Sequence, residues 1–283
     1  MKRGENKSMK TKRLLSQLGY HLMMLVLVLL MIFPFLWMLS ASFKQDIDIL
    51  TTPIRWIPHP ATLENYRRAL TEVPFLIYLR NTVIVAVCGT TLQAVCCALA
   101  GYAFAKLRFC GKWLMFTAFI ATMMMPWHSI MIPQYVIMSQ LRLTDTLLVL
   151  ILMQAFSAFG IFLLRQFFMQ LPDSLREAAK IDGAGELRIF WQVMLPHAAS
   201  ALSALVIFTF IGQWNDYISP LVYLNSQRLY TLQLGLKSFE GQYTTQYGVV
   251  MAGTVCCLIP IFLIYLVFEK QICAGIVFTG MKN

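Results

Sequence analysis

The sequence predicts an all-α fold, a polytopic membrane helical bundle with six transmembrane helices and a pair of short cytoplasmic helices. Three observations predict it. The 283 residues are 58% hydrophobic and only 13% charged, the mean hydropathy is +0.65, and long uncharged stretches recur along the chain. A soluble domain carries about twice as many charged residues. Because backbone groups in lipid must be satisfied internally, helices are favoured over irregular structure.

Six uncharged, mainly apolar runs approach or exceed the roughly 20 residues that a helix needs to cross the hydrocarbon core. They are Leu14 to Phe43, Asn81 to Ala105, Trp113 to Leu141, Thr146 to Leu164, Ile189 to Asn215 and Gly241 to Phe268. The first run follows a basic tail, residues 1–13, and lacks the short apolar core and small-residue cleavage site of a signal peptide. We therefore expect a cytoplasmic tail over residues 1–13 and one membrane domain over residues 14–283.

The distribution of positive charge predicts the topology. Cytoplasmic loops of membrane proteins are enriched in Lys and Arg, so the net charge of +10 requires no nucleic acid partner. Lys106, Arg108 and Lys112 follow the second span with no acidic residue among them, which indicates a cytoplasmic loop. If each span reverses direction, both termini and the charged segment 172–196 lie in the cytoplasm. Residues 44–79 and 225–247 then lie outside.

The chain shows no catalytic or metal-binding motif. It lacks the phosphate-binding pattern G-x-x-x-x-G-K-[ST] and the metal motif H-E-x-x-H. Its four histidines are isolated and its seven cysteines lack zinc-ligand spacing. We therefore expect no enzyme activity, no cofactor and no metal site. The prolines within spans, Pro34, Pro126, Pro133 and Pro260, are interpreted as packing kinks, with hinges in a moving pathway as the alternative.

A charged segment that contains two glycines separates the fourth and fifth spans. Ser174 followed by Glu177 fits a capping box, so a short helix is expected to begin there. By i, i+3, i+4 spacing one face of this helix would carry Leu175, Ala178, Ala179 and Asp182. Because two alanines form the centre of that face, another surface can approach the helix backbone closely.

A second short helix is expected directly after this one. Gly183 stands where a helix end needs a residue with positive φ, and the next helix would begin near Gly185. Its apolar stripe, at i, i+3, i+4 and i+7, would be Leu187, Phe190, Trp191 and Met194. Pro196 would end it and start the fifth span. The segment thus predicts an L-shaped helix pair with one arm anchored to the bundle, and an ordinary interfacial amphipathic loop is the alternative.

The same segment resembles the cytoplasmic signature of permease subunits of ATP-binding-cassette importers. The matching positions are Glu177, Ala178, Ala179, Gly183, Val193, Leu195 and Pro196, with Val193 where isoleucine is more usual. Neighbouring stretches, among them "MMMPWHSIMIPQY", "FIGQWNDYISPLVYL", "TLQLGL" and the terminal "AGIVFTGMKN", resemble the carbohydrate-uptake branch of the maltose-permease G type. The terminal stretch departs from the Gly-rich end that is common in that branch.

The resemblance implies a function and a set of partners. The segment 172–196, with Asp182 beside the matching positions, would dock into a cleft on a cytoplasmic ATPase subunit and would move when the ATPase dimer closes on ATP. The implied partners are a homologous permease, two ATP-binding subunits, an extracytoplasmic solute-binding protein, membrane lipid and a carbohydrate. The implied location is a bacterial inner membrane. ATP would be bound by the partner subunits.

The translocation path is the less specific part of this prediction. Trp214, Asn215 and Asp216 at the outer end of the fifth span, and Gln154 in the fourth, are candidates for stacking on and hydrogen bonding to a sugar. Trp and Tyr also serve as interfacial anchors at that depth, which is the simpler explanation. The alternatives are an importer of glycerol phosphate, an amino acid or a polyamine, and a secondary transporter. The paired repeats and buried ionisable residues of a secondary transporter are not visible.

Overall fold

The computed structural model describes residues 2–241 and 245–280, with the side chains described for 17–241 and 245–266. The chain forms two compact units. The first comprises Met1–Glu72 and Phe239–Cys256, and the second comprises Val73–Ser238 and Cys257–Asn283. The helix α15 (Tyr247–Gly280) contributes to both. Helices account for the regular structure of the described residues, which contain no strand and one isolated bridge between Glu240 and Thr245.

The first unit consists of α1 (Lys2–Ser42), α2 (Asp46–Ile49), α3 (Glu64–Thr71) and the beginning of α15. The buried Asn65 joins its parts, because its Nδ2 donates to the carbonyl oxygens of Ser42 at 3.0 Å and Lys44 at 2.6 Å. The Asp46 carboxylate accepts a hydrogen bond from the backbone N–H of Gly248 at 2.7 Å. These bonds hold α15 against the loop that follows α1.

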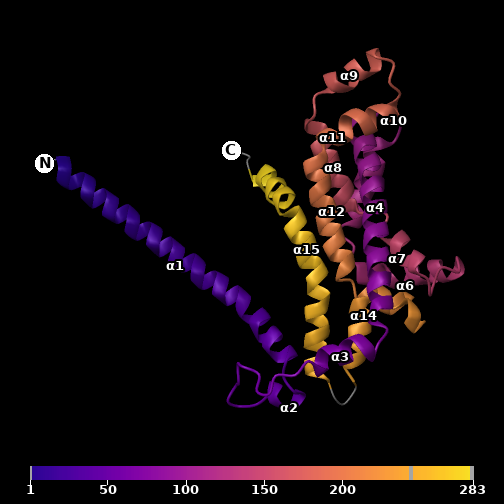
Figure 1. Cartoon of the computed structure of the whole chain (residues 1–283). Coiled ribbons are helices and arrows are strands. Elements are labelled where there is room, and N and C mark those ends of the chain that lie inside the picture. Colours follow the sequence, from indigo (N-terminus) through magenta and orange to yellow (C-terminus); the bar gives the residue numbers. More distant parts are fainter. Residues whose placement is uncertain (1, 242–244, 281–283) are drawn as a thin grey trace. The chain divides into compact units, whose positions relative to one another are not determined.

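The second unit is built around α4 (Phe75–Lys106). Figure 1 shows α7 (Leu147–Met153), α8 (Ala158–Gln170) and α12 (Ala199–Trp214) running beside it, with α14 (Leu232–Leu236) near its beginning. Small residues on α4 let these neighbours approach closely, as is typical of membrane helix pairs. At Gly89 an added Cβ would lie only 2.3 Å from the side-chain oxygen Oε1 of Gln213 on α12. No residue larger than glycine fits there unless Gln213 moves.

The structure supports the prediction of up to six spans, but three of them are bent helix pairs. Three helical segments are long and apolar enough to cross a membrane, Gln17–Ser42, Phe75–Lys106 and Tyr247–Leu266. Three further spans exist if each bent helix pair counts as one. The second span begins earlier in the sequence than predicted, and the sixth begins later. Helix α4 continues through Arg80, whose charge ends the apolar run but not the helix, and α15 begins at Tyr247 instead of Gly241.

The third, fourth and fifth predicted spans are broken instead of continuous. The breaks separate α5 (Lys112–Thr122) from α6 (Trp127–Gln140) by 107°, α7 from α8 by 44°, and Glu186–His197 from α12 by 82°. Pro126 precedes α6 at the first break, where its missing N–H costs no helical hydrogen bond. Ser157 caps α8 at the second, because its Oγ accepts from the N–H of Gly160 at 3.2 Å. Pro34, Pro133 and Pro260 lie inside helices.

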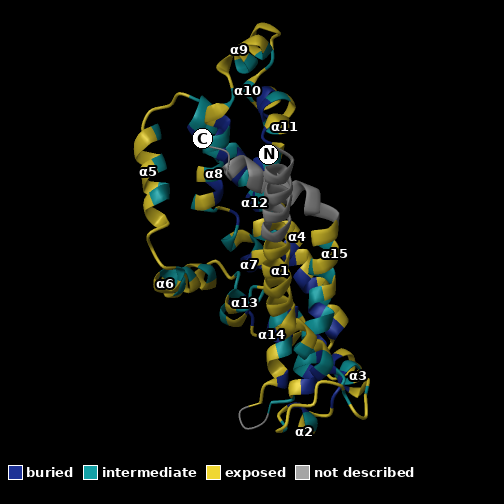
Figure 2. Ribbon diagram, turned by 90° about the vertical axis from the view of Figure 1, so that its left-hand side faces the viewer, coloured by how far each residue is buried: buried dark blue, intermediate teal, exposed yellow. Residues whose placement is uncertain are grey.

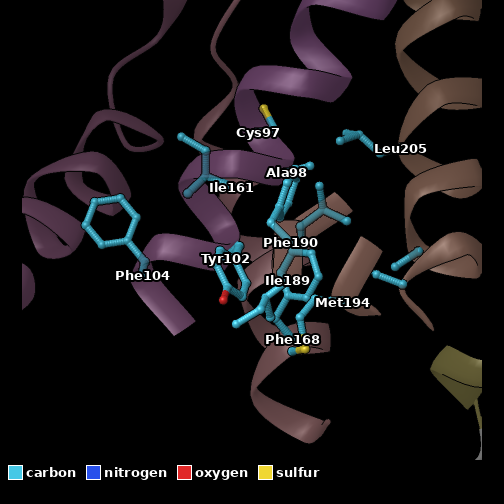
Figure 3. Close-up of a cluster of buried hydrophobic side chains, with 13 residues drawn as sticks. Cys97, Ala98, Tyr102, Phe104, Ile161, Phe168, Ile189, Phe190, Met194 and Leu205 are labelled. Carbon is cyan, nitrogen blue, oxygen red and sulfur yellow. The ribbon is translucent and has the colours of Figure 1, made fainter. Parts of the chain in front are cut away.

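Burial within the second unit concentrates where α4, α8 and the residues before α12 meet. Figure 3 shows Tyr102 of α4, Phe168 of α8, and Phe190 and Met194 pointing toward one another. The Tyr102 ring lies 5.8 Å from that of Phe168 and 5.4 Å from that of Phe190, centroid to centroid. By contrast, α5 and α6 contain no buried residue, and Figure 2 shows them largely exposed.

Short elements connect the spans. They are α9 (Asp173–Ile181), α10 (Glu186–Ile189), the π-helix η1 (Phe190–Met194), α11 (Leu195–His197), α13 (Ile218–Tyr223), and the 3₁₀ turns η2 (Gln227–Leu229) and η3 (Lys237–Phe239). Two of them, α10 and η1, contribute Ile189, Phe190 and Met194 to the core of the second unit. The buried Asn81 fixes the segment after α13, because its Nδ2 donates to the carbonyls of Arg228 at 2.9 Å and Tyr230 at 3.0 Å.

Candidate functional site

The charged segment forms the predicted helix pair with a different start. Helix α9 begins after Pro172, so Ser174 lies within its first turn and no side-chain cap is present; the predicted capping box is wrong. Pro172, with φ −59°, occupies the cap position in place of Ser174. Gly183 has φ +78°, as predicted for the turn. Helix α10 begins at Glu186 after Gly185, also as predicted. Figure 1 shows the pair at one end of α4, α8 and α12.

The outward face of α9 differs from the predicted one. Ser174, Glu177, Ala178 and Ile181 are exposed, at i, i+3, i+4 and i+7, and we call them the outer face. Ile181 is 86% exposed, which is unusual for an isoleucine. Ala179 instead packs against the core cluster, and Leu175 is half-buried. The predicted face was rotated because Leu175 and Ala179 both turn inward. Asp182, at the end of α9, is exposed.

One carboxylate ties the two short helices to the bundle. Glu186 accepts two hydrogen bonds from Arg176, at 2.6 and 3.2 Å, and forms an ion pair with Lys180 at 2.8 Å. The hydroxyl of Tyr102 on α4 donates to it at 2.8 Å. We call these residues the Glu186 clamp. The Arg176 guanidinium, with Lys180 and Tyr102, lowers the pKa of Glu186 to about 2. The clamp is therefore charged at every physiological pH.

A second ion pair supports the start of α9. The Nζ of Lys106, at the end of α4, lies 2.6 Å from Oδ1 of Asp173 and donates to the carbonyl oxygen of Leu171 at 2.7 Å. The Lys106 side chain is only 6% exposed, so it is packed against neighbouring residues where it reaches Asp173. Its charge lowers the pKa of the Asp173 carboxyl. Helix α9 is thus fastened to α4 directly by Lys106 and indirectly by Tyr102, through Glu186.

The second arm packs through a different stripe from the predicted one. Phe190 and Met194 are buried as expected, but Leu187 is 70% and Trp191 47% exposed. Ile189 is the buried residue in their place. Residues 190–194 form a π-helix, whose hydrogen bonds span five residues instead of the four of an α-helix. Side chains spaced for a period of 3.6 residues therefore do not fall on one face there. π-Helical turns occur often at functional sites.

The remaining signature positions lie around the bend before α12. Val193 and Leu195 are half-buried and pack against the core cluster, whereas Pro196 is exposed. The fifth span begins at Ala199, after the fully buried Ala198, instead of at Pro196. Because the bend is 82°, residues 186–197 run nearly perpendicular to α12.

A cavity of about 750 Å³ lies in the second unit, where α4, the α7–α8 break and the end of α12 meet. The chain lines it with amide, hydroxyl and aromatic side chains and one carboxylate. The lining residues are Gln93, Trp127, Met153, Gln154, Phe156, Ser157, Asn215, Asp216, Tyr217, Ile218, Ser219 and Tyr223. Its size falls within the range of ligand pockets, roughly 300 to 1,000 Å³.

Three of the four candidate path residues meet at this cavity. The Nε2 of Gln154 donates to Oδ2 of Asp216 at 3.3 Å, and the backbone N–H of Ser219 donates to Oδ1 at 3.1 Å. The exposed Asn215 lines the cavity beside them. The fourth, Trp214, is 2% exposed and does not line it. Its Nε1 donates to the carbonyl of Cys257 at 3.3 Å, so its placement is that of a packing residue.

Other lining residues were not candidates from the sequence. Gln93 is 7% exposed, and its Nε2 donates to Oγ1 of Thr209 on α12 at 3.1 Å. Trp127 comes to the cavity because the chain turns by 107° before α6. Tyr223 follows the "WND" stretch by only a few residues, which was the available signal. Among the described residues, no group of three His, Cys, Asp or Glu could hold a metal ion.

A family model describes most of the chain. The model for "Binding-protein-dependent transport system inner membrane component" matches residues 95–272. This match contains the charged segment and all the lining residues of the cavity except Gln93.

Similar proteins cover nearly the full length. The arabinooligosaccharides transport system permease protein AraQ of Halalkalibacterium halodurans is 30% identical, with 89% of this chain and 91% of the relative covered. The diacetylchitobiose uptake system permease protein NgcG of Streptomyces coelicolor is 34% identical, with 92% and 87% covered. A chain in a crystal structure of a bacterial ABC transporter that imports the acidic polysaccharide alginate matches with a TM-score of 0.80, 25% identity, and 89% and 95% coverage.

Proposed function

Because the chain belongs to the family of binding-protein-dependent transport system inner membrane components, we propose that it is a permease subunit of an ATP-binding-cassette importer for a carbohydrate. It would form the translocation pathway with a homologous permease, and two separate ATP-binding subunits would drive it. The relatives named above import oligosaccharides or a polysaccharide by their printed names. The observation that carries the proposal is the outer face of α9, which is exposed while the rest of its helix is fastened to the bundle.

The outer face has the properties of a docking surface for an ATPase subunit. Glu177 and Ala178 are exposed beside Ile181, which is 86% exposed, so the surface combines a small residue, an apolar contact and a charge. Ala178 lets a partner approach the helix backbone. Gly183 and Asp182 at the end of α9 extend this surface toward the turn.

The Glu186 clamp gives a route by which movement of α9 would reach the cavity. Arg176 joins α9 to Glu186, and Glu186 joins Tyr102 of α4. Helix α4 is continuous from Phe75 to Lys106, and Tyr102 and Gln93 on it are about 14 Å apart along the axis at 1.5 Å per residue. Because Gln93 lines the cavity, a rigid displacement of α4 changes the cavity wall. Binding of ATP to the ATPase can shift the equilibrium between two conformations of this chain only if the ATPase contacts α9 differently in the two conformations.

The sugar path would use the cavity. Asn215 and Gln154 provide amide donors and acceptors, and Asp216 accepts hydrogen bonds; these groups suit sugar hydroxyls. The topology predicted from the Lys and Arg distribution places residues 172–196 and both termini in the cytoplasm and the segments 44–79 and 225–247 outside. The outer segments would then receive an extracytoplasmic solute-binding protein. Residues 242–244 and 281–283 lie outside the described residues.

The test is reconstitution of the complete transporter in liposomes, with ATP hydrolysis and uptake of a radiolabelled oligosaccharide measured together. We expect uptake to require ATP and the binding protein. Ala178→Asp, which places a second charge on the outer face, should abolish the coupling of hydrolysis to uptake and weaken ATPase binding. Arg188→Ala is the matched control, because Arg188 is exposed on the same segment and its side chain donates a hydrogen bond to the nearby Gln192. Uptake that follows an ion gradient and ignores ATP would overturn the proposal.

A further inference from the structure

Building on the importer function proposed above, we infer that the cavity accepts neutral saccharides and excludes anionic ones. The structure assigns the charge preference to Asp216. This preference does not follow from the family match, because the alginate transporter of the same fold imports an acidic polysaccharide.

The charge of the lining carries the inference. Asp216 is the only charged side chain among the lining residues that the structure describes. Lys, Arg and His are absent from that lining. A carboxylate or phosphate that enters such a cavity leaves water without gaining an opposite charge, which is costly. A neutral saccharide brings no such cost.

The hydrogen-bond donors of Asp216 carry no positive charge that would offset a carboxylate. Gln154 and the backbone N–H of Ser219 are its donors, and both are neutral groups. An ion pair would have cancelled the field of the carboxylate, but a neutral donor only orients it. Asp216 is half-buried, so its repulsion of an anion is less screened than that of a surface residue.

The aromatic walls act in the same direction. Trp127, Phe156 and Tyr217 line the cavity. The face of an aromatic ring carries the negative end of its quadrupole. Such a face attracts the C–H groups of a sugar ring and disfavours an anion. The lining thus combines neutral aromatic rings with one negative charge.

The experiment measures binding directly on the complete complex of this chain, its second permease and the ATPase subunits in nanodiscs, without the binding protein. Isothermal titration compares a neutral oligosaccharide with a uronic acid oligosaccharide of equal length. We expect the neutral ligand to bind more tightly. Asp216→Asn should reduce that preference about tenfold, the effect of a moderate charge interaction. The control Asp216→Glu should keep it.

Several results would overturn the inference. Equal affinity of wild type for the two ligands, or an unchanged preference in Asp216→Asn, removes the role of Asp216. If Asp216→Asn does not assemble, wild type is titrated at about 1 M salt, where the screening length is about 3 Å. Binding of the anionic ligand should then strengthen, and no change contradicts the charge preference. ATP-driven uptake by the same preparation tests the proposed function separately.

Discussion

The hydroxyl of Tyr102 donates a hydrogen bond of 2.8 Å to the carboxylate of Glu186, and this bond joins the longest continuous helix of the second unit to the start of α10. Arg176 and Lys180 reach the same carboxylate from α9. The outer face of α9 is thereby connected to α4 through a single acidic side chain. The exposed helix α9 and a wall of the cavity are thus connected through α4, which carries both Tyr102 and the lining residue Gln93.

Removal of the Tyr102 hydroxyl should weaken this connection without removing the helix pair. In Tyr102→Phe the ring keeps its contacts with Phe168 and Phe190, but Glu186 loses one donor. We expect uptake per ATP hydrolysed to fall several-fold, with a loss of about 1 kcal/mol in stability. Paired uptake and hydrolysis assays measure the ratio. An unchanged ratio would show that coupling bypasses this bond. Tyr20→Phe, on the exposed face of α1, is the control.

The charge of Glu186 predicts how stability depends on pH. Its pKa in the folded protein is about 2, below its ordinary value of 4.5. A lowered pKa means that the stabilising contribution is complete above pH 4.5 and is lost as the pH falls from 4.5 toward 2. Thermal unfolding of wild type and Glu186→Gln should therefore differ by a constant amount above pH 4.5 and converge below it. A difference that persists at the lowest pH would contradict the clamp.

The sequence predicted the helical class, the number of apolar segments and the helix pair because these depend on local patterns. Gly183 and the start of α10 were placed correctly for this reason. The breaks in the spans were not predicted, since a window of apolar residues looks the same whether the helix is straight or bent by 107°. The stripe through Leu187 and Trp191 failed because the period assumed was that of one continuous α-helix, whereas α10 ends at Ile189 and residues 190–194 form a π-helix.

The candidate cavity was predicted only in part. Gln154 and Asp216 were identified because polar residues in or beside apolar runs stand out in the sequence, and they meet in the structure. Trp127 and Tyr223 were missed because aromatic residues in membrane segments are common and only the three-dimensional arrangement distinguishes those at a cavity. Trp214 illustrates the converse, since the sequence cannot show that its indole is buried against Cys257.

The glycines of the charged segment offer a matched pair of substitutions. Gly183 has φ +78° and Gly185 has φ −72°, and neither has an atom within 4 Å of an added Cβ. The two sites thus differ in backbone conformation but not in space. Gly183→Ala should cost about 1 kcal/mol, because an L-residue in the left-handed region is strained. Gly185→Ala should be nearly neutral. Thermal unfolding measures both, and equal losses would show that the positive φ is not required.

The contact between Gly89 and Gln213 predicts a coupled pair of substitutions. An added Cβ at Gly89 would lie 2.3 Å from Oε1 of Gln213, whose side-chain amide is buried and unpaired among the described residues. Gly89→Ala should therefore destabilise the protein by roughly 1 to 3 kcal/mol, the cost of overpacking. Gly212→Ala, with no atom within 4 Å of the added Cβ, is the control on α12.

The double variant decides whether the steric contact is the cause. Gln213→Ala removes the atoms that an added Cβ on Gly89 would meet, and it also removes an amide that is buried without a partner. In this background Gly89→Ala should cost much less, so that the two substitutions show an interaction energy of at least about 0.5 kcal/mol. Additive effects in a double-mutant cycle of unfolding free energies would mean that α4 and α12 already separate enough to admit the side chain. The close approach of the two helices at Gly89 would then have no role in stability.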